Sequence, residues 1–397
     1  MTQFGRQPGR GVRSMAMEAA REALQDAGVE AREVGRIFLG NAAAGVVTQQ
    51  EMIRGQVALR GSELAGIPLM NIENACASGS SAFKLAWESV ASGACEVALA
   101  IGVEQLNHED RSRPFNALRG STDIEEIGES EPGVVAANSV LMDVYAGEAR
   151  EYLESSDASV DDFARVAVKN RRHASENPLA HFRTPQTIEE VLGARTIVEP
   201  LTLSMCSPLT DGAAAIVVVS PERAARVPAP VRVRGCEMAA GTGRGSSPVA
   251  DAVGAVYRSS GAGPDDLDVL ELHDAAAPAE LIQYAEVGIC EEGEAHHLVR
   301  RGETELGGRL PVNTSGGLMS RGHPLGATGT SQLVEIVTQL RRRAGGRQVP
   351  DARVGMAVNG GGWLGGAYAT AVATVLEREG GAAGRQAGEP GPSPVDI

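Results

Sequence analysis

The chain has 397 residues, of which 43% are hydrophobic, so it can bury a large core as two domains or two similar halves. Its formal net charge of −15 excludes the basic face that non-specific binding of nucleic acid needs. The five cysteines are scattered and form no CxxC pair, which indicates reduced thiols. We find neither a long apolar window nor the apolar core of a signal peptide. We therefore expect a globular protein of the cytoplasm that does not enter a membrane.

Helices and short apolar strands alternate over residues 1–103, which is typical of α/β layers. From residue 107 to 197 polar residues dominate, and long helical patterns occur there without neighbouring strands. We interpret this segment as an insertion that folds over the site. The predicted elements up to the end of the insertion are helices over residues 14–28, 49–59, 80–92, 134–155 and 160–177, and strands over residues 34–39, 67–72 and 95–103.

The chain then repeats a similar order of elements. A strand over residues 213–219 returns to the main sheet, and the later predicted elements are strands over residues 231–235, 269–272, 354–358 and 367–376, and helices over residues 249–260, 278–288 and 330–343. This order predicts a duplicated unit, with a first half over 1–224, a loop domain over about 107–197 inserted into it, and a second half over 225–379. The Gly- and Pro-rich residues 380–397 are predicted to be a disordered tail.

The chain is organised around Cys76, which stands at a predicted strand-to-helix junction within Asn74–Ser81. Small neighbours leave its sulfur unobstructed, and the free N–H groups and positive dipole end of the helix favour the thiolate. A nucleophile needs this geometry. A cysteine is also often a small buried hydrophobic residue, and this stretch alone leaves both interpretations open.

Several separated motifs resemble the thiolase superfamily and together cover nearly the whole chain. The matching segments are Asn74–Gly79, Gly102–Glu104, Asp211–Ala215 and Gly322–Gly329. Val168–Pro178 and the pair His273-Asp274 are similar to thiolases of the sterol-carrier-protein type, which are often described as lipid-transfer proteins. The resemblance implies the five-layered αβαβα thiolase fold, a homodimer, acyl-CoA thioesters as substrates in lipid metabolism, coenzyme A as co-substrate, and no tightly bound cofactor or metal.

The resemblance also implies roles for particular residues. Cys76 would accept the acyl group, His323 would activate it and help to hold a thioester oxygen, and His273 would contribute to the first oxyanion hole. The backbone N–H groups of Cys76 and Gly360 would form the second. Such groups are needed because a thiol with a pKa of about 8.5 is mostly protonated at neutral pH, and because each preorganised donor at an oxyanion stabilises it by roughly 3–4 kcal/mol.

Each histidine has a structural alternative. His323 lies between glycine and proline in a glycine-rich loop, which favours a functional role, whereas His273 ends a predicted strand and could be a structural histidine. We predict that the other histidines are solvated, although His173 falls within a family motif, and that the other cysteines pack in the core. A metal site is not predicted at His296-His297, because no third ligand is evident in the sequence.

The chain departs from the family pattern where a second cysteine would carry a proton to or from the substrate α-carbon. The two possible positions hold Val358 and Ala275, and neither side chain can carry a proton. The ordinary carbon–carbon step therefore lacks its acid or base. The family also has an apolar strand before its Thr-x-Phe-Gly-Arg motif, whereas here that motif begins at Thr2, and a misassigned or truncated start is one expectation from this difference.

Three hypotheses follow. The first is an acyltransferase of the thiolase type, similar to acetyl-CoA acetyltransferases, that acts through a covalent acyl group on Cys76. The second is a retro-aldolase acting on β-hydroxyacyl-CoA side chains such as those of sterols, for which the tyrosines nearest in sequence to the altered positions are Tyr284 and Tyr368. The third is a non-catalytic subunit that binds acyl-CoA and works with a small OB-fold partner.

Overall fold

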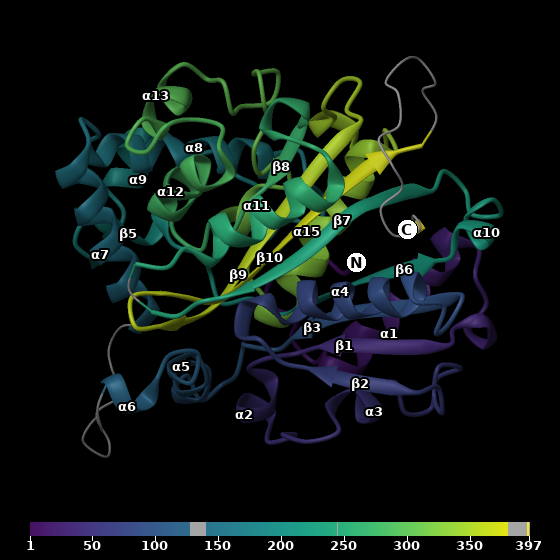
Figure 1. Cartoon of the computed structure of the whole chain (residues 1–397). Helices are drawn as coiled ribbons and strands as arrows, with labels where there is room; N and C mark the ends of the chain where they lie inside the picture. Colours follow the sequence, from purple (N-terminus) through teal and green to yellow (C-terminus); the bar gives the residue numbers. More distant parts are fainter. Residues whose placement is uncertain (128–139, 244, 380–394, 397) are drawn as a thin grey trace.

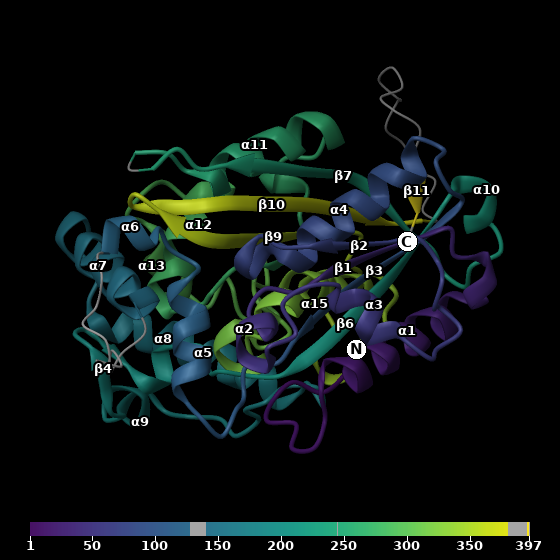
Figure 2. The same cartoon turned by 90° about the horizontal axis from the view of Figure 1, so that it is seen from below.

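The structure, a computed structural model, describes residues 1–127, 140–243, 245–379 and 395–396. The two halves of the chain form the expected five alternating layers of helices and strands (Figures 1 and 2). Helices α4 (Ser78–Ala91) and α15 (Leu325–Leu340) form the central layer and touch each other between the two sheet regions. None of the helices in the described ranges is long and apolar enough to cross a membrane.

The first half contributes four strands in the order β2-β1-β3-β6. The first three strands run parallel, and β6 runs antiparallel to β3. Helix α1 packs on the outer face of this sheet region and ends where Gly28 adopts a left-handed φ of 63°. The elements are α1 (Val12–Ala27), β1 (Arg36–Gly40), α2 (Ala44–Thr48), α3 (Arg54–Leu59), β2 (Leu69–Ile72), β3 (Val97–Glu104) and β6 (Gly212–Val219).

The second half also contributes four strands, in the order β7-β10-β9-β8, with a different pattern of strand directions. Strand β8 runs parallel to β9, while β10 runs antiparallel to both β9 and β7. Helices α11 and α12 pack against each other, and α11 covers β7 and β10. The elements are α10 (Pro221–Ala224), β7 (Val231–Ala240), α11 (Pro248–Ser260), β8 (Val269–Glu271), α12 (Ala277–Val287), α13 (Ala295–Arg300), α14 (Gly317–Arg321), β9 (Val354–Leu364) and β10 (Ala367–Arg378).

A short strand near the end of the chain joins the two halves into one nine-stranded sheet. Strand β11 (Val395–Asp396) lies between β6 and β7, and pairs with Val219 on one side and Val233 on the other. The prediction of a disordered tail is therefore wrong for these two residues, because the facing edges of β6 and β7 offer unpaired backbone groups that capture them. The rest of that predicted tail lies outside the described residues.

The inserted segment folds mostly as helices beside the second half. Helices α7 and α8 pack against α12, and a small strand pair, β4–β5, accompanies them, although the sequence pattern predicted helices without neighbouring strands. The predicted helix over 134–155 is described only from residue 140 onward, as α7. The elements are α5 (Ser112–Arg119), α6 (Ile124–Ile127), α7 (Val140–Ser155), α8 (Val160–Ser175), α9 (Ile188–Leu192), β4 (Thr196–Val198) and β5 (Leu201–Thr202).

The central helices approach each other and the first sheet through glycines, and this contact positions the site. A Cβ atom at Gly102 would lie 2.4 Å from the carbonyl oxygen of Gly326, so only glycine fits there. Apolar side chains of α4 and α15, among them Phe83 and Ile336, are fully buried between the two sheet regions. Burial of each such side chain contributes roughly 1.5–3 kcal/mol. This packing fixes the start of α4, where Cys76 lies, beside the start of α15, where His323 lies.

Candidate active site

Cys76 lies in a single helical turn, η2 (Ala75–Ala77), between strand β2 and helix α4, as the sequence predicted. The preceding residue, Ala75, adopts a left-handed φ of 46°, which a residue with a side chain rarely takes. The hydroxyl of Ser78 donates to the Ala75 carbonyl at 2.7 Å and accepts the Asn74 N–H, which holds this turn in place. The side chain of Cys76 is 5% exposed.

The expected lowering of the Cys76 pKa by the helix dipole is not what the structure shows. Burial of the sulfur raises the pKa of Cys76 to about 12, and the carboxylate of Glu104 adds to this increase. The backbone N–H groups of Gly362 and of Cys76 itself act in the opposite direction but are outweighed. Desolvation wins because the sulfur has lost its water, whereas the dipole of one helix is a modest effect. The thiol therefore needs a base.

His323 follows helix α14 and has a defined protonation pattern. The only hydrogen of the Thr328 hydroxyl is donated to the Pro324 carbonyl at 3.0 Å, so that hydroxyl accepts from Nδ1 of His323 at 2.7 Å. Nε2 of His323 is consequently the unprotonated nitrogen. Burial, and then the nearby His273 and Arg321, lower the pKa of His323 well below its usual value, so the ring is neutral at rest.

His273 follows strand β8 and has the opposite tautomer. In the structure the amide nitrogen of Asn359 lies 2.9 Å from Nδ1 of His273, and the Asn359 oxygen faces the Ser80 hydroxyl at 2.8 Å, a hydroxyl that also lies 2.9 Å from the Ala77 carbonyl. With the amide in this orientation, its nitrogen donates to Nδ1. Nε2 of His273 therefore carries the proton. Burial lowers the pKa of His273 to about 3, so this ring is also neutral and serves as a hydrogen-bond donor.

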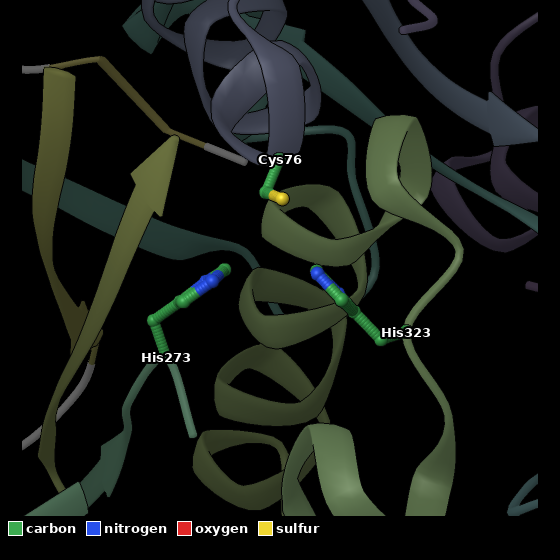
Figure 3. A group of neighbouring side chains, drawn as sticks. All are labelled: Cys76, His273 and His323. Carbon is green, nitrogen blue, oxygen red and sulfur yellow. The ribbon is translucent and has the colours of Figure 1, made fainter. Parts of the chain in front are cut away.

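The three predicted site residues converge although they are far apart in sequence. The Cys76 sulfur and one ring nitrogen of each histidine all lie within 4.8 Å of one another. Figure 3 shows the side chains of Cys76, His273 and His323 pointing toward a common point from three separate segments. The two rings meet edge to face with centroids 5.2 Å apart. The arrangement places an unprotonated nitrogen and an N–H donor beside one thiol.

Two buried carboxylates brace the backbone around these residues, and their roles could not be read from the sequence. Glu104 accepts from the N–H groups of Ala42, Ala43, Ala44 and Gly326 at 2.7–3.1 Å, which ties the loop after β1 to the start of α15. The carboxylate of Asp274 accepts from the Leu318 N–H at 2.7 Å and so joins the His273 loop to α14, the helix before His323. In the sequence, the features that pointed to these two carboxylates were the motifs Gly102–Glu104 and His273-Asp274.

An apolar cavity of about 230 Å³ opens above Cys76 and His323. A large part of its wall comes from the inserted segment, and its only charged side chain within the described residues is Arg195. The lining residues from that segment are Phe115, Leu118, Leu141, Met142, Tyr145, Arg195 and Ile197. A cavity of this size and character suits the acyl part of a thioester.

The positions of the absent second cysteine hold no acid or base in the structure either. Ala275 lines the cavity, and Val358 is buried in the core. The structure instead brings two tyrosines to this place: Tyr145 lines the cavity, and its hydroxyl lies 3.3 Å from that of Tyr368. Tyr368 also meets His273 edge to face at 5.7 Å. Sequence reasoning missed Tyr145, since it belongs to the inserted helix α7.

Tyr284, the other tyrosine considered from the sequence, points elsewhere and donates to Glu280 at 2.5 Å. The glycines after Asn359 are close to the site as predicted, but the N–H that acts on the Cys76 sulfur belongs to Gly362. Gly360 pairs with Ala371 within the regular ladder of β9 and β10. Its role in a second oxyanion hole stays a prediction.

Two of the histidines expected to be solvated are buried. His173 accepts the Leu306 N–H through Nε2 at 3.1 Å and bonds the Asn313 carbonyl through Nδ1 at 3.1 Å, so it is structural. His296 lies 2.5 Å from Asp157, which is the third group that the sequence did not reveal beside His297. Asp157 also lies 3.7 Å from Arg300, so an ion-pair cluster accounts for this group.

Comparison with known proteins decides the family. The thiolase N-terminal domain matches residues 1–222, and the thiolase C-terminal domain-like family matches residues 237–378. The chain belongs to the thiolase family. It is 36% identical over 358 residues to the benzoylsuccinyl-CoA thiolase subunit BbsB of Thauera aromatica, covering 87% of this chain and 89% of that protein.

Sterol-carrier relatives are also among the similar thiolases, as the sequence motifs predicted. The chain is 33% identical over 391 residues to sterol carrier protein 2 of Rattus norvegicus, covering 92% of this chain and 69% of that protein. Among solved structures, an Ltp2-ChsH2(DUF35) aldolase is similar with a TM-score of 0.77 and 27% identity, covering 95% of this chain and 96% of that one. These matches confirm the predicted thiolase fold.

Proposed function

We propose that this thiolase-family chain transfers acyl groups from coenzyme A thioesters through a covalent acyl group on Cys76. The observation that carries the proposal is the convergence of Cys76 with two neutral histidines in opposite tautomers, all within 4.8 Å. Nε2 of His323 accepts the thiol proton as the sulfur attacks the thioester carbonyl. The Nε2–H of His273 contributes to a first oxyanion hole that holds a thioester oxygen, and the backbone N–H groups of Cys76 and Gly360 form the second, which holds the oxyanion that this attack creates.

The resting site holds a neutral thiol and a neutral imidazole, because burial disfavours both charged forms. Proton transfer from Cys76 to His323 therefore becomes favourable only when a thioester oxygen can take up the negative charge. The apolar cavity receives the acyl chain and keeps water away from the acylated sulfur. Coenzyme A is the co-substrate, and we propose that the chain works as a homodimer.

Intact-protein mass spectrometry with a panel of acyl-CoAs tests the proposal. Wild type should gain the mass of one acyl group, and Cys76→Ala should gain none. Cys206→Ala is the matched control, because Cys206 lines the same cavity and is buried like Cys76, and it should acylate as wild type does. A wild-type protein that forms no adduct with any acyl-CoA, or an adduct that persists in Cys76→Ala, would contradict covalent transfer.

A second candidate function is retro-aldol cleavage of β-hydroxyacyl-CoA side chains, such as those of sterols. Two observations favour it: the similarity to the Ltp2-ChsH2(DUF35) aldolase, and the absence of a proton-carrying residue at Ala275 and Val358. Incubation with β-hydroxyacyl-CoAs in the absence of free coenzyme A should then release an aldehyde or ketone, measured by derivatisation. No release from any such substrate would end this alternative.

A third candidate is a subunit that binds acyl-CoA and needs a partner, such as a small OB-fold protein, for chemistry. One relative is named as a thiolase subunit, and the similar aldolase is named for two proteins. Stable binding of acyl-CoA by the isolated chain without any adduct would support this candidate. Turnover by the isolated chain would rule it out.

A further inference from the structure

The proposed acyl-transfer step does not use the two tyrosines beside the candidate site. Tyr145 comes from α7 and Tyr368 from β10, both are buried, and their hydroxyl oxygens lie 3.3 Å apart. Tyr145 lines the acyl cavity together with Cys76 and Ala275. It is close enough to Cys76 that a negative charge there raises the pKa of Tyr145. A phenol that can donate a proton therefore stands where the second cysteine is absent.

A second, smaller cavity of about 80 Å³ lies on the other side of this pair, and Tyr368 lines it. Glu148, one helical turn after Tyr145 on α7, lines the same cavity, and its Oε2 is buried without a hydrogen-bond partner in the described residues. The space is large enough for more than one water molecule. The side chains thus trace a path from the acyl cavity through Tyr145 and Tyr368 to Glu148.

We propose that Tyr145 protonates the α-carbon of a 3-ketoacyl-CoA when the bond between its α- and β-carbons breaks, and that Tyr368 and Glu148 return a proton to Tyr145 from the second cavity. The inference rests on the proposed covalent function and extends it to carbon–carbon cleavage. Tyr145 is the catalytic acid, while Tyr368 and Glu148 act through it.

Cleavage begins when the Cys76 sulfur, deprotonated by His323, bonds the β-carbonyl carbon, and the bond between the α- and β-carbons breaks with its electron pair on the α-carbon. Tyr145 gives its proton to that carbon, which releases acetyl-CoA from a substrate without an α-substituent and leaves the shortened acyl group on Cys76. Tyr368 reprotonates Tyr145, Glu148 reprotonates Tyr368 through water, and Glu148 regains its proton from solvent. His323 then loses the Cys76 proton to solvent and takes the thiol proton of coenzyme A, whose sulfur attacks the acyl group on Cys76. The shortened acyl group leaves as an acyl-CoA, and His323 returns the proton to Cys76.

The charges around Glu148 suit a proton donor. Burial, followed by the negative charges of Glu286 and Glu151, raises the pKa of Glu148 to about 8, so its carboxyl is mostly protonated at neutral pH. Glu286 faces the same cavity from α12 and has a raised pKa for the same reason, burial. The described residues that line this cavity include no lysine or arginine. Burial also raises the pKa of Tyr145 and of Tyr368 well above the usual value, so both phenols hold the proton that the cleavage step needs.

The decisive variant is Tyr145→Phe, compared with Tyr257→Phe. Tyr257 is the matched control because its hydroxyl also donates one internal hydrogen bond, to the Val287 carbonyl at 2.9 Å, away from the site. Two reactions are measured: acylation of Cys76 by butyryl-CoA, and coenzyme-A-dependent cleavage of 3-ketoacyl-CoAs of about 4–12 carbons. Tyr145→Phe should lose about 100-fold in cleavage, as expected for a general acid, and its acylation, which needs no proton at the α-carbon, should fall by a much smaller factor. Tyr257→Phe should change neither reaction.

The pH profile of cleavage distinguishes proton transfer from Glu148 through Tyr368 to Tyr145 from an effect of Glu148 on packing. Because the Glu148 proton is present below its pKa and lost above it, wild-type cleavage should fall as pH rises through about 8. Glu148→Gln should be slower at pH 7 and should lack this fall, whereas Glu151→Gln, exposed on the same helix, should retain the fall at a slightly lower pH, because the Glu151 charge helps to raise the pKa of Glu148. If wild type does not acylate Cys76 at all, the proposed function itself is refuted. Two other outcomes would refute only the role of Tyr145 as the acid. In the first, Cys76 is acylated and Tyr145→Phe still cleaves 3-ketoacyl-CoAs at the wild-type rate. In the second, Cys76 is acylated but wild type cleaves no 3-ketoacyl-CoA.

Discussion

The candidate site is built from two regions of opposite character that meet at Cys76. Below the sulfur lies a dense network of buried charges, in which Lys169 of α8 lies 2.9 Å from Glu280 and Arg321 lies 3.2 Å from Glu271. Above it, the lining of the acyl cavity, which includes residues of the inserted segment and Cys206, forms an apolar wall with few polar atoms. We call these regions the polar floor and the apolar wall.

The comparison shows how the fold separates two tasks. Buried charges without partners cost several kcal/mol each, so the polar floor keeps its geometry only when every group is paired. The hydrogen bonds of Thr328 and Asn359 hold the two histidines of the site within this frame. The wall is formed mainly by apolar side chains such as Leu141 and Met142, which can change with the acyl chain at small cost. Catalytic geometry should therefore respond to changes in the floor, and substrate choice to changes in the wall.

The largest expected effect concerns the pH dependence of thiol reactivity. Because burial raises the pKa of Cys76 to about 12, the thiolate fraction should grow about tenfold per pH unit from pH 7 to 10 without a plateau. Iodoacetamide labelling followed by peptide mass spectrometry measures this rate. Cys206 in the apolar wall is an internal control, since burial raises its pKa to about 12 as well. A plateau for Cys76 alone would mean that the floor stabilises a thiolate–imidazolium pair.

Removing a charge from the polar floor should cost much stability. Lys169→Met leaves Glu280 charged and unpaired, at a cost of about 3–5 kcal/mol in the free energy of unfolding measured in urea. Arg172→Met is the matched control on the same helix, because its ion pair with Glu305 is exposed and should contribute at most about 1 kcal/mol. Equal losses in the two variants would show that the buried pair has no special role.

Parts of both regions could be predicted from the sequence. The Cys76 stretch and the glycine-rich loop at His323 carry local signals, so their elements and their convergence were expected. The pKa of Cys76 could not be predicted, because its burial depends on packing between segments. Tyr145 was missed for the same reason, and the motif around Lys169 and His173 gave no hint that these side chains are buried. Sequence patterns report local structure, whereas desolvation is set by the assembled fold.

A smaller effect on the rate of acylation should follow when the tautomer of His323 is disturbed. Thr328→Val removes the acceptor that keeps the proton of His323 on Nδ1, so we expect acylation of Cys76 to slow about 10- to 100-fold in rapid-quench measurements. Thr330→Val, two residues later, is the matched control, because the Thr330 hydroxyl is buried without a partner in the described residues. If both variants slow acylation equally, packing of α15 rather than the tautomer controls the rate.

The smallest effect should come from the apolar wall and should change substrate choice only. Met142→Trp on α7 reduces the space in the acyl cavity, so the preferred acyl-CoA should become shorter. Each methylene that no longer fits forfeits about 0.8 kcal/mol, or about fourfold in kcat/KM. Met52→Trp, at a 79% exposed position, should leave the profile across chain lengths unchanged. A Met142→Trp variant that slows all chain lengths equally would show that the wall also sets the geometry at Cys76, and the division between floor and wall would fail.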